Sequence, residues 1–326
     1  MNKFIENFIK ITIKLIHSKF LKIVFIFTIL FTVLVQFVNF KNRFSDILVI
    51  KHPVFLLYAI PFVFGTLILH VITWRIIIND FDGKINYSNS IFIYNFSALS
   101  RYIPGNYWYI ISRSVLGKEK GLSYKNSILS SGIELIFNIL SAVLISTLIR
   151  VMGFTLNYQQ FIWLLFIFIL ILFPILIFLK IDIDKINNKE VKNYLEKIKI
   201  LILSLKTNIY QSPQKYFFLF LLFICIWLSQ GLSFYFILST WGKINFQYIP
   251  IIVTSYATGW VIGFLNPLTP NGIGTRETIF ITILKGIIPV STLLGASLII
   301  RIFVLIGEFI LALISWLFLR KINYRN

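Results

Sequence analysis

Long apolar runs alternate with short polar segments along the whole chain. Four of these runs contain no Asp, Glu, Lys or Arg and are long enough to cross roughly 30 Å of hydrocarbon as helices. Two more, residues 128–149 and 290–319, have the same pattern apart from Glu134 in one and Arg301 with Glu308 in the other. The pattern therefore predicts about six full transmembrane helices. The four uncharged runs are residues 23–40, 53–74, 161–179 and 216–241.

Two other apolar regions are interrupted by proline and glycine. Residues 88–116 are split at Pro104 and Gly105, and residues 248–285 are split by a stretch that starts at Pro267. Three of the four arms are too short to span a membrane, and the fourth comes only near the required length. Non-helical backbone at membrane depth is tolerated where protein or a water-filled cavity covers it. We therefore expect two re-entrant helical hairpins whose broken tips mark a site.

Composition supports a membrane protein and narrows its partners. With 58% hydrophobic residues and a mean hydropathy of +0.85, the 326 residues have more apolar surface than one soluble core could bury, which indicates an all-α polytopic membrane protein. The net charge of +19 does not indicate a nucleic-acid partner, because cytoplasmic loops of membrane proteins are rich in Lys and Arg. Cys225 is the only cysteine and the three histidines are scattered, so we expect no internal disulfide, no metal site and no cofactor.

The distribution of positive charge predicts that both termini lie in the cytoplasm. With both hairpins treated as re-entrant, 22 Lys and Arg fall on the inside and six on the outside. The order is then span, span, hairpin, span, repeated once. Residues 1–150 and 151–326 are therefore expected to form two inverted repeats of one membrane domain, unless the proline breaks are ordinary kinks. Glu134 and Arg301 would occupy equivalent places, where they could pair near the centre of the fold.

A charged linker, residues 180–214, joins the two halves. Its lysines are interleaved with apolar residues, which is typical of a helix lying on anionic lipid headgroups. This basic cytoplasmic segment is also a candidate docking surface for a separate synthase or glycosyltransferase.

Charged side chains inside the predicted membrane region are the main candidates for function, because each costs at least about 2.5 kcal/mol at the bilayer centre. Arginine suits phosphate, since its planar guanidinium donates two parallel hydrogen bonds and stays charged when desolvated. We predict that Arg101, Arg113 and Arg276 contact the phosphate of an anionic lipid headgroup. The alternative is that the charges form structural pairs that only hold the hairpins closed. The residues expected to form switching ion pairs are Glu134, Glu277 and Arg301.

The same residues carry a resemblance to a known family. Residues 101–108 read Arg-Tyr-Ile-Pro-Gly-Asn-Tyr-Trp, with Arg113 and Glu134 following, and residues 270–277 read Pro-Asn-Gly-Ile-Gly-Thr-Arg-Glu. Together they resemble the transmembrane, flippase-like domain of bacterial lysylphosphatidylglycerol synthases and of stand-alone membrane proteins. Members typically show aromatic-(Leu/Ile)-Pro-Gly-x-x-Trp with a following Arg, and Pro-Gly-Gly-(Leu/Ile)-Gly-x-Arg-Glu. Asn271 stands where the family usually has glycine, which a left-handed turn can accept.

The resemblance covers nearly the whole chain and implies lipid translocation in a bacterial or archaeal cell (inner) membrane. An anionic phospholipid and a polyprenyl-linked envelope precursor are equally admissible substrates. It also implies that the chain is not an enzyme, because aminoacyl transfer in the synthases resides in a soluble C-terminal domain and this chain ends six residues after Arg320. Two alternatives stay open: a scaffold that docks a synthase or glycosyltransferase, and a membrane lipid transferase that uses Glu134 or Glu277 as its base. The candidate substrate-binding residues are Arg101, Pro104, Gly105, Trp108, Arg113, Glu134, Pro270, Gly272, Gly274, Arg276, Glu277 and Arg301.

Overall fold

The structure is a computed structural model that describes residues 50–82, 85–102, 107–151, 203, 207–266 and 269–323. Every regular element within these ranges is a helix, and none is a strand. Five of the helical stretches in the described ranges are long and apolar enough to cross a membrane. The prediction of an all-α polytopic membrane protein is therefore confirmed.

Four long helices form the frame. They coincide with four of the six expected spans, whereas residues 23–40 and 161–179 lie outside the described residues, as does most of the linker 180–214. The fifth candidate span, Phe246–Leu265, is the first arm of the second hairpin, so this arm is longer than expected for a re-entrant helix. The four frame helices are α4 (Val54–Asp82), α7 (Tyr124–Val151), α10 (Pro213–Leu238) and α13 (Val290–Asn323).

Helix α4 continues eight residues beyond the uncharged run that ends at residue 74. Polar contacts explain the extension. Arg75 donates from Nε to the carbonyl of Ile85 at 2.9 Å. Asp80 accepts from Lys215 and, at 2.8 Å, from the Tyr216 hydroxyl at the start of α10. The end of α4 is thus tied to the beginning of α10.

The first interrupted region is a hairpin of two short helices. Each helix has 12 residues, about 18 Å at 1.5 Å per residue, so neither arm can cross the hydrocarbon core. The hydroxyls of Ser100 and Ser112 are 2.6 Å apart across the two arms. Pro104 and Gly105 lie outside the described residues. The elements are α5 (Tyr87–Ala98), the 3₁₀ helix η2 (Leu99–Tyr102) and α6 (Trp108–Glu119).

The second interrupted region is also a hairpin. Gly259 of the first arm faces Phe280 of the second, and Gly263, four residues later, faces Arg276, four residues earlier. The two helices are therefore antiparallel. The returning helix has only 10 residues, about 15 Å, and cannot cross alone. The elements are η4 (Phe246–Tyr248), α11 (Ile249–Leu265), η5 (Pro270–Gly272) and α12 (Thr275–Leu284).

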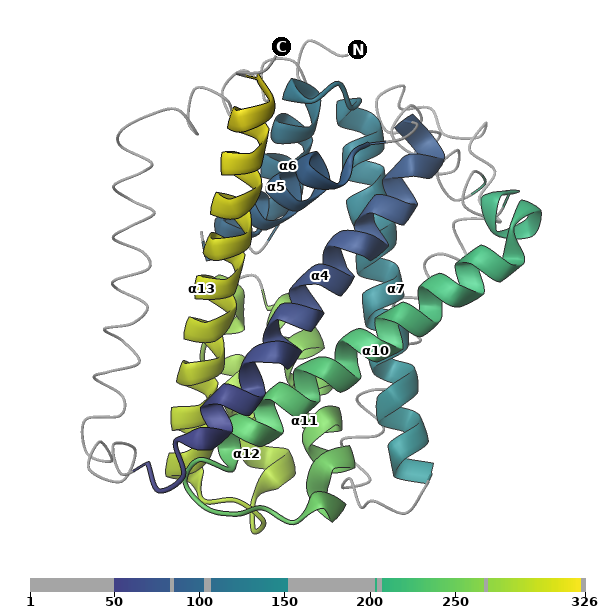
Figure 1. The fold of residues 1–326 in the computed structure, drawn as a ribbon. Helices are drawn as coiled ribbons and strands as arrows, with labels where there is room; N and C mark the ends of the chain where they lie inside the picture. Colours follow the sequence, from purple (N-terminus) through teal and green to yellow (C-terminus); the bar gives the residue numbers. More distant parts are fainter. Residues whose placement is uncertain are drawn as a thin grey trace.

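The two hairpins lie at opposite ends of the molecule and their tips meet between them. In Figure 1, α5 and α6 occupy the upper part and α11 and α12 the lower part, while η2 contacts η5. The first arm of each hairpin packs on the last helix of the other half: α5 on α13, and α11 on α7. Helices α4 and α10 pack against each other. This reciprocal arrangement is the one that two inverted repeats would produce.

Close packing anchors the second hairpin to the frame. Phe234 of α10, Tyr256 of α11 and Phe280 of α12 form a buried cluster with ring centroids 4.8 to 5.9 Å apart. A Cβ atom at Gly231 would lie 2.4 Å from the Val253 side chain, so α10 and α11 approach this closely only because residue 231 is glycine. The hairpin tip is therefore presented from a well-packed base.

Candidate functional site

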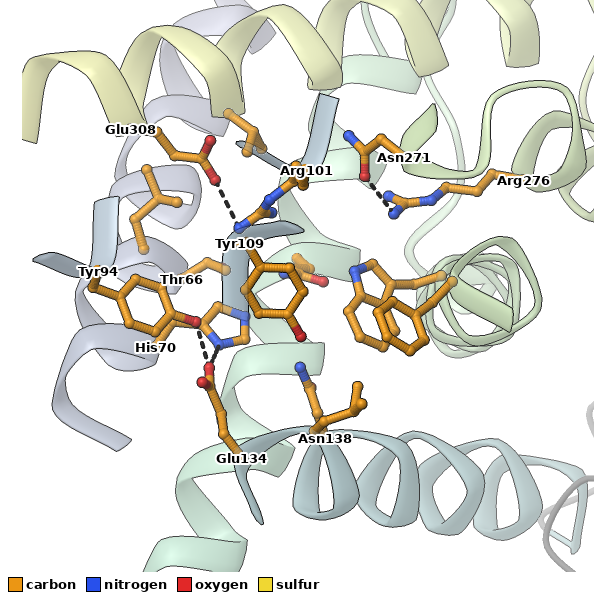
Figure 2. A pocket seen from close by; sticks show the side chains of 16 residues that line it. Thr66, His70, Tyr94, Arg101, Tyr109, Glu134, Asn138, Asn271, Arg276 and Glu308 are labelled. Carbon is orange, nitrogen blue, oxygen red and sulfur yellow. Dashed lines mark hydrogen bonds and ion pairs between the residues drawn. The ribbon is translucent and has the colours of Figure 1, made fainter. Parts of the chain in front are cut away.

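A cavity lined by charged, polar and apolar side chains lies between the two hairpin tips (Figure 2). Its volume is about 70 Å³, room for a few water molecules or one small anionic group. Helix α4 contributes Thr66 and His70, η2 contributes Arg101, α12 contributes Arg276 and α13 contributes Glu308. Convergent polar side chains from several helices, at the centre of an apolar protein, are typical of a substrate site.

Arg101 reaches from the tip of the first hairpin to the second half of the chain. Its Nη2 lies 3.2 Å from Oε1 of Glu308, and its Nε donates to the Ala98 carbonyl at 3.0 Å. The Glu308 side chain is only 1% exposed, and neither of its oxygens accepts a well-formed hydrogen bond from another described residue. A single ion pair therefore compensates a deeply buried carboxylate.

Arg276 approaches the same cavity from the second hairpin. Its Nη2 donates to Oδ1 of Asn271 at 2.9 Å, while its Nε is buried without a hydrogen-bond partner. Among the described residues, no carboxylate lies within ion-pairing distance of its guanidinium. Trp260 and Phe264, stacked with ring centroids 5.3 Å apart, form an aromatic wall of the cavity. Arg276 thus brings an uncompensated positive charge to a protected site.

Glu134 does not pair with Arg301, contrary to the prediction. It binds Arg113 instead: Nη1 of Arg113 is 2.6 Å from Oε2 of Glu134, and Tyr94 donates its hydroxyl to Oε1. His70 Nδ1 lies 3.6 Å from the same Oε1. Arg113 is fully buried and its guanidinium carbon lies 3.9 Å from the Tyr94 ring centroid. We call the Arg113–Glu134 pair the first clasp, because it joins α6 to α7.

Arg301 forms a second clasp with Glu277, joining α12 to α13. Nη2 of Arg301 is 2.8 Å from Oε1 of Glu277, which also accepts from the Ser297 hydroxyl. Oε2 of Glu277 accepts from the Gly274 backbone N–H at 2.7 Å, which caps α12. This cap explains why the returning helix begins at Thr275, directly after Gly274. The two clasps join equivalent elements of the two halves with the charges exchanged.

A comparison with known protein families decides the affiliation. Residues 19–312 match the family described as "Lysylphosphatidylglycerol synthase TM region". The chain belongs to this family. Membership places it among membrane proteins involved in lipid-related processes, as the resemblance had suggested. A comparison with curated proteins returned no match.

The geometry gives a physical reason for the family's glycine-rich second motif in this chain. Asn271 adopts a left-handed conformation with φ 49°, so the departure from glycine is accepted as expected. Gly272 has φ 67°, and a Cβ there would lie 2.7 Å from the Gly263 Cα. Gly274 has φ 81° and precedes the capped end of α12. The turn therefore presses η5 against α11 and points Arg276 at the cavity.

The structure divides the predicted site residues into two groups. Arg101, Glu134 and Arg276 line the cavity, whereas the other described candidates do not. Arg113 in particular lies behind the wall, with Nη1 bound to Glu134. The candidates outside the lining are Trp108, Arg113, Pro270, Gly272, Gly274, Glu277 and Arg301.

Sequence reasoning missed several neutral residues of the lining. Asn138 and Gln230 lie in α7 and α10, and Trp260 lies in the second hairpin. A carboxamide inside an apolar span is the signal that could have found the first two, because burying it there is costly without a partner. Glu308 was recognised as a charge at membrane depth but was not assigned to the site.

Proposed function

We propose that the protein translocates an anionic lipid between leaflets, with the headgroup phosphate held between the two hairpin tips. One observation carries the proposal: Arg101 and Arg276, from different hairpins, line the same cavity, and Arg276 has no carboxylate partner among the described residues. Two guanidinium groups that converge on one space suit a phosphate, whose oxygens accept charge-assisted hydrogen bonds. The acyl or prenyl chain would remain in lipid.

The Arg101–Glu308 pair supplies a switch for this function. At 3.2 Å the contact is longer than a strong charge-assisted hydrogen bond, so a bound phosphate can compete with Glu308 for Arg101. Because η2 and α13 belong to different halves, this competition would loosen the contact between them. Alternate exposure of one central site by two inverted halves is the movement that such a switch would control. The energy would come from an ion gradient or from downhill movement of the lipid.

We further propose that the protein transports rather than catalyses. The two carboxylates considered as a transferase base are both engaged, Glu134 with Arg113 and Glu277 with Arg301, which supports transport. The expected setting is the cell membrane with both termini in the cytoplasm. The first hairpin would then enter from the cytoplasm and the second from outside.

Lipid movement in vesicles tests the proposal. Purified protein is reconstituted with trace fluorescent phosphatidylglycerol, and exposure of the label to a membrane-impermeant quencher is followed in time. Losing one charged hydrogen-bond donor costs about 1.5–3 kcal/mol, so Arg276→Met should slow exposure by about tenfold to a hundredfold.

Arg320→Met is the matched control, because Arg320 is an exposed residue near the end of α13 and does not line the cavity. It should move lipid at the wild-type rate. Equal rates for Arg276→Met and wild type, at equal protein content, would contradict the assignment of Arg276. A wild-type rate no higher than that of empty vesicles would refute translocation of phosphatidylglycerol.

A further inference from the structure

Buried polar atoms without partners concentrate around the cavity. Twelve described residues have a buried side-chain nitrogen or oxygen that lacks a hydrogen-bond partner, and six of these residues line this one cavity. Leaving such groups unpaired inside a protein is costly, and it is tolerated where a ligand supplies the missing bonds. The six residues are Thr66, His70, Asn138, Gln230, Arg276 and Glu308. Two of them still have a charged neighbour, since Glu308 lies 3.2 Å from Arg101 and His70 lies 3.6 Å from Glu134.

The unpaired atoms are of two chemical kinds. Arg276 offers an unused donor at Nε, beside Arg101. Asn138 and Gln230 instead offer unused carbonyl oxygens, Oδ1 and Oε1, which can only accept. In Figure 2, Arg101 and Arg276 lie on one side of the cavity and Asn138 on the opposite side, with Tyr109 between them. A complementary ligand therefore carries acceptors at one end and donors at the other.

Charge restricts the ligand further. Of the two carboxylates in the lining, Glu134 is neutralised by Arg113 and Glu308 by Arg101. Among the arginines and carboxylates of the described lining, the charge of Arg276 is the only one without an ion-pair partner. One negative charge compensates it, whereas a second would be buried without a partner at high cost. The ligand is therefore a monoanion. The unpaired carbonyl oxygens of Asn138 and Gln230 further require that it donate hydrogen bonds.

We infer that the cavity selects a monoanionic phosphodiester headgroup whose remaining polar groups are neutral hydroxyls. This inference rests on the proposed function and deepens it by naming the substrate class. A hydroxyl needs only an acceptor, which the amides of Asn138 and Gln230 supply. An ammonium group would add a further positive charge to a lining that, with Glu134 paired to Arg113, already has two arginines, Arg101 and Arg276, against the one carboxylate of Glu308. Ethanolamine lipids and lipids with a net positive aminoacyl headgroup are therefore excluded from this class.

Binding of short-chain lipids to the purified full chain in detergent tests the inference. Isothermal titration calorimetry compares dihexanoyl phosphatidylglycerol, a monoanion with hydroxyls, with dihexanoyl phosphatidylethanolamine and dihexanoyl phosphatidic acid. Phosphatidylglycerol should bind at least about tenfold more tightly than either competitor, because only it satisfies both ends of the cavity. The phosphatidic acid arm separates hydroxyl recognition from simple attraction of phosphate.

Variants assign the preference to the acceptor end. Gln230→Leu should reduce the preference for phosphatidylglycerol over phosphatidic acid by about tenfold, the effect of one buried hydrogen bond. Gln247→Leu is the matched control, since Gln247 is exposed in η4 and does not line the cavity. It should keep the wild-type preference. Thermal unfolding of both variants shows whether they are folded, and Asn138→Leu replaces Gln230→Leu if that variant unfolds.

The outcomes for the two proposals are separable. Equal or tighter binding of phosphatidylethanolamine, or no binding of any of the three lipids, would overturn the inference even if the protein moves lipids in vesicles. A strong preference for phosphatidylglycerol, unchanged in both Gln230→Leu and Asn138→Leu, would also overturn it. Selective binding without any vesicle transport would instead leave the inference standing and refute translocation.

Discussion

Replacing Glu134 by glutamine should destabilise the protein, because it leaves the charge of Arg113 buried and unpaired. Arg113 is 0% exposed, and its Nη1 lies 2.6 Å from Glu134. Its other contacts are neutral: the hydroxyls of Ser97 and Ser131 at 3.3 Å and the ring of Tyr94 at 3.9 Å. None of these can replace the lost carboxylate.

The expected loss of stability depends on whether one member of the Arg113–Glu134 pair is replaced or both are. Breaking a buried ion pair by removing one partner costs about 3–5 kcal/mol. The cation–π contact with Tyr94 and the two serine hydroxyls persist, so we place the loss for Glu134→Gln near the lower end, at about 3 kcal/mol. Exchanging both members, Arg113→Met with Glu134→Met, removes the unpaired charge and should cost only about 1–2 kcal/mol, mainly for the acceptor that Tyr94 loses.

The assay is reversible unfolding of the purified protein in mixed micelles, followed by far-ultraviolet circular dichroism. Asp80→Asn provides a matched control, because it changes a carboxylate to an amide in a pair with Lys215 whose side chains are 20% and 36% exposed. A partly exposed pair of this kind contributes up to about 1 kcal/mol. The contrast between the two substitutions isolates the effect of burial.

Two results would refute the reasoning. A loss for Glu134→Gln no larger than that for Asp80→Asn would mean that the first clasp does not hold α6 to α7. A double variant as unstable as the sum of the single variants would mean that the two side chains are not coupled. Either result would leave Arg113 available for a ligand, as the sequence suggested.

Three further predictions concern the scaffold around the cavity. Gly272→Ala should cost about 1–3 kcal/mol, because its Cβ would meet Gly263 in a left-handed turn, and wild-type stability in the same unfolding assay would argue against that close approach. Ser100→Cys with Ser112→Cys, in a chain without the native cysteine, should form a disulfide on mild oxidation; free thiols by mass spectrometry would contradict the antiparallel arms. Trp227→Phe should cost about 1–3 kcal/mol by removing the indole N–H donated to α7, and a loss below about 0.5 kcal/mol would show that these bonds are dispensable.

The sequence predicts the elements of this fold well because their signals are local. An uncharged apolar run fixes a span, and a break at Pro104 and Gly105 fixes the ends of two short arms, which the structure places at residues 87–98 and 108–119. The left-handed turn at Asn271 is likewise a property of a few neighbouring residues. Helix bounds differ from the apolar runs by a few residues, and at the end of α4 the polar contacts of Arg75 and Asp80 accompany the extension.

The partners of the buried charges could not be predicted in the same way. Glu134 was expected to meet Arg301, yet it meets Arg113, only 21 positions earlier in the chain. The choice depends on the rotation and depth of α6 and α7 once packed, which the sequence pattern leaves open. The Arg101–Glu308 pair is harder still to predict, because it joins the tip of the first hairpin to the last helix of the second half.

The two clasps place their charges on opposite members of each helix pair, and this bears on whether the arginines move a lipid or only close the hairpins. In the first half the hairpin carries the arginine and the following helix the glutamate, and in the second half the order is reversed. Each clasp is electrically complete, so neither needs a ligand and neither attracts one. What remains unbalanced is Arg276, together with a single long contact between Arg101 and Glu308. The arginines therefore fall into two groups: Arg113 and Arg301 hold the hairpins through their ion pairs, and Arg101 and Arg276 are the ones that we propose bind a phosphate.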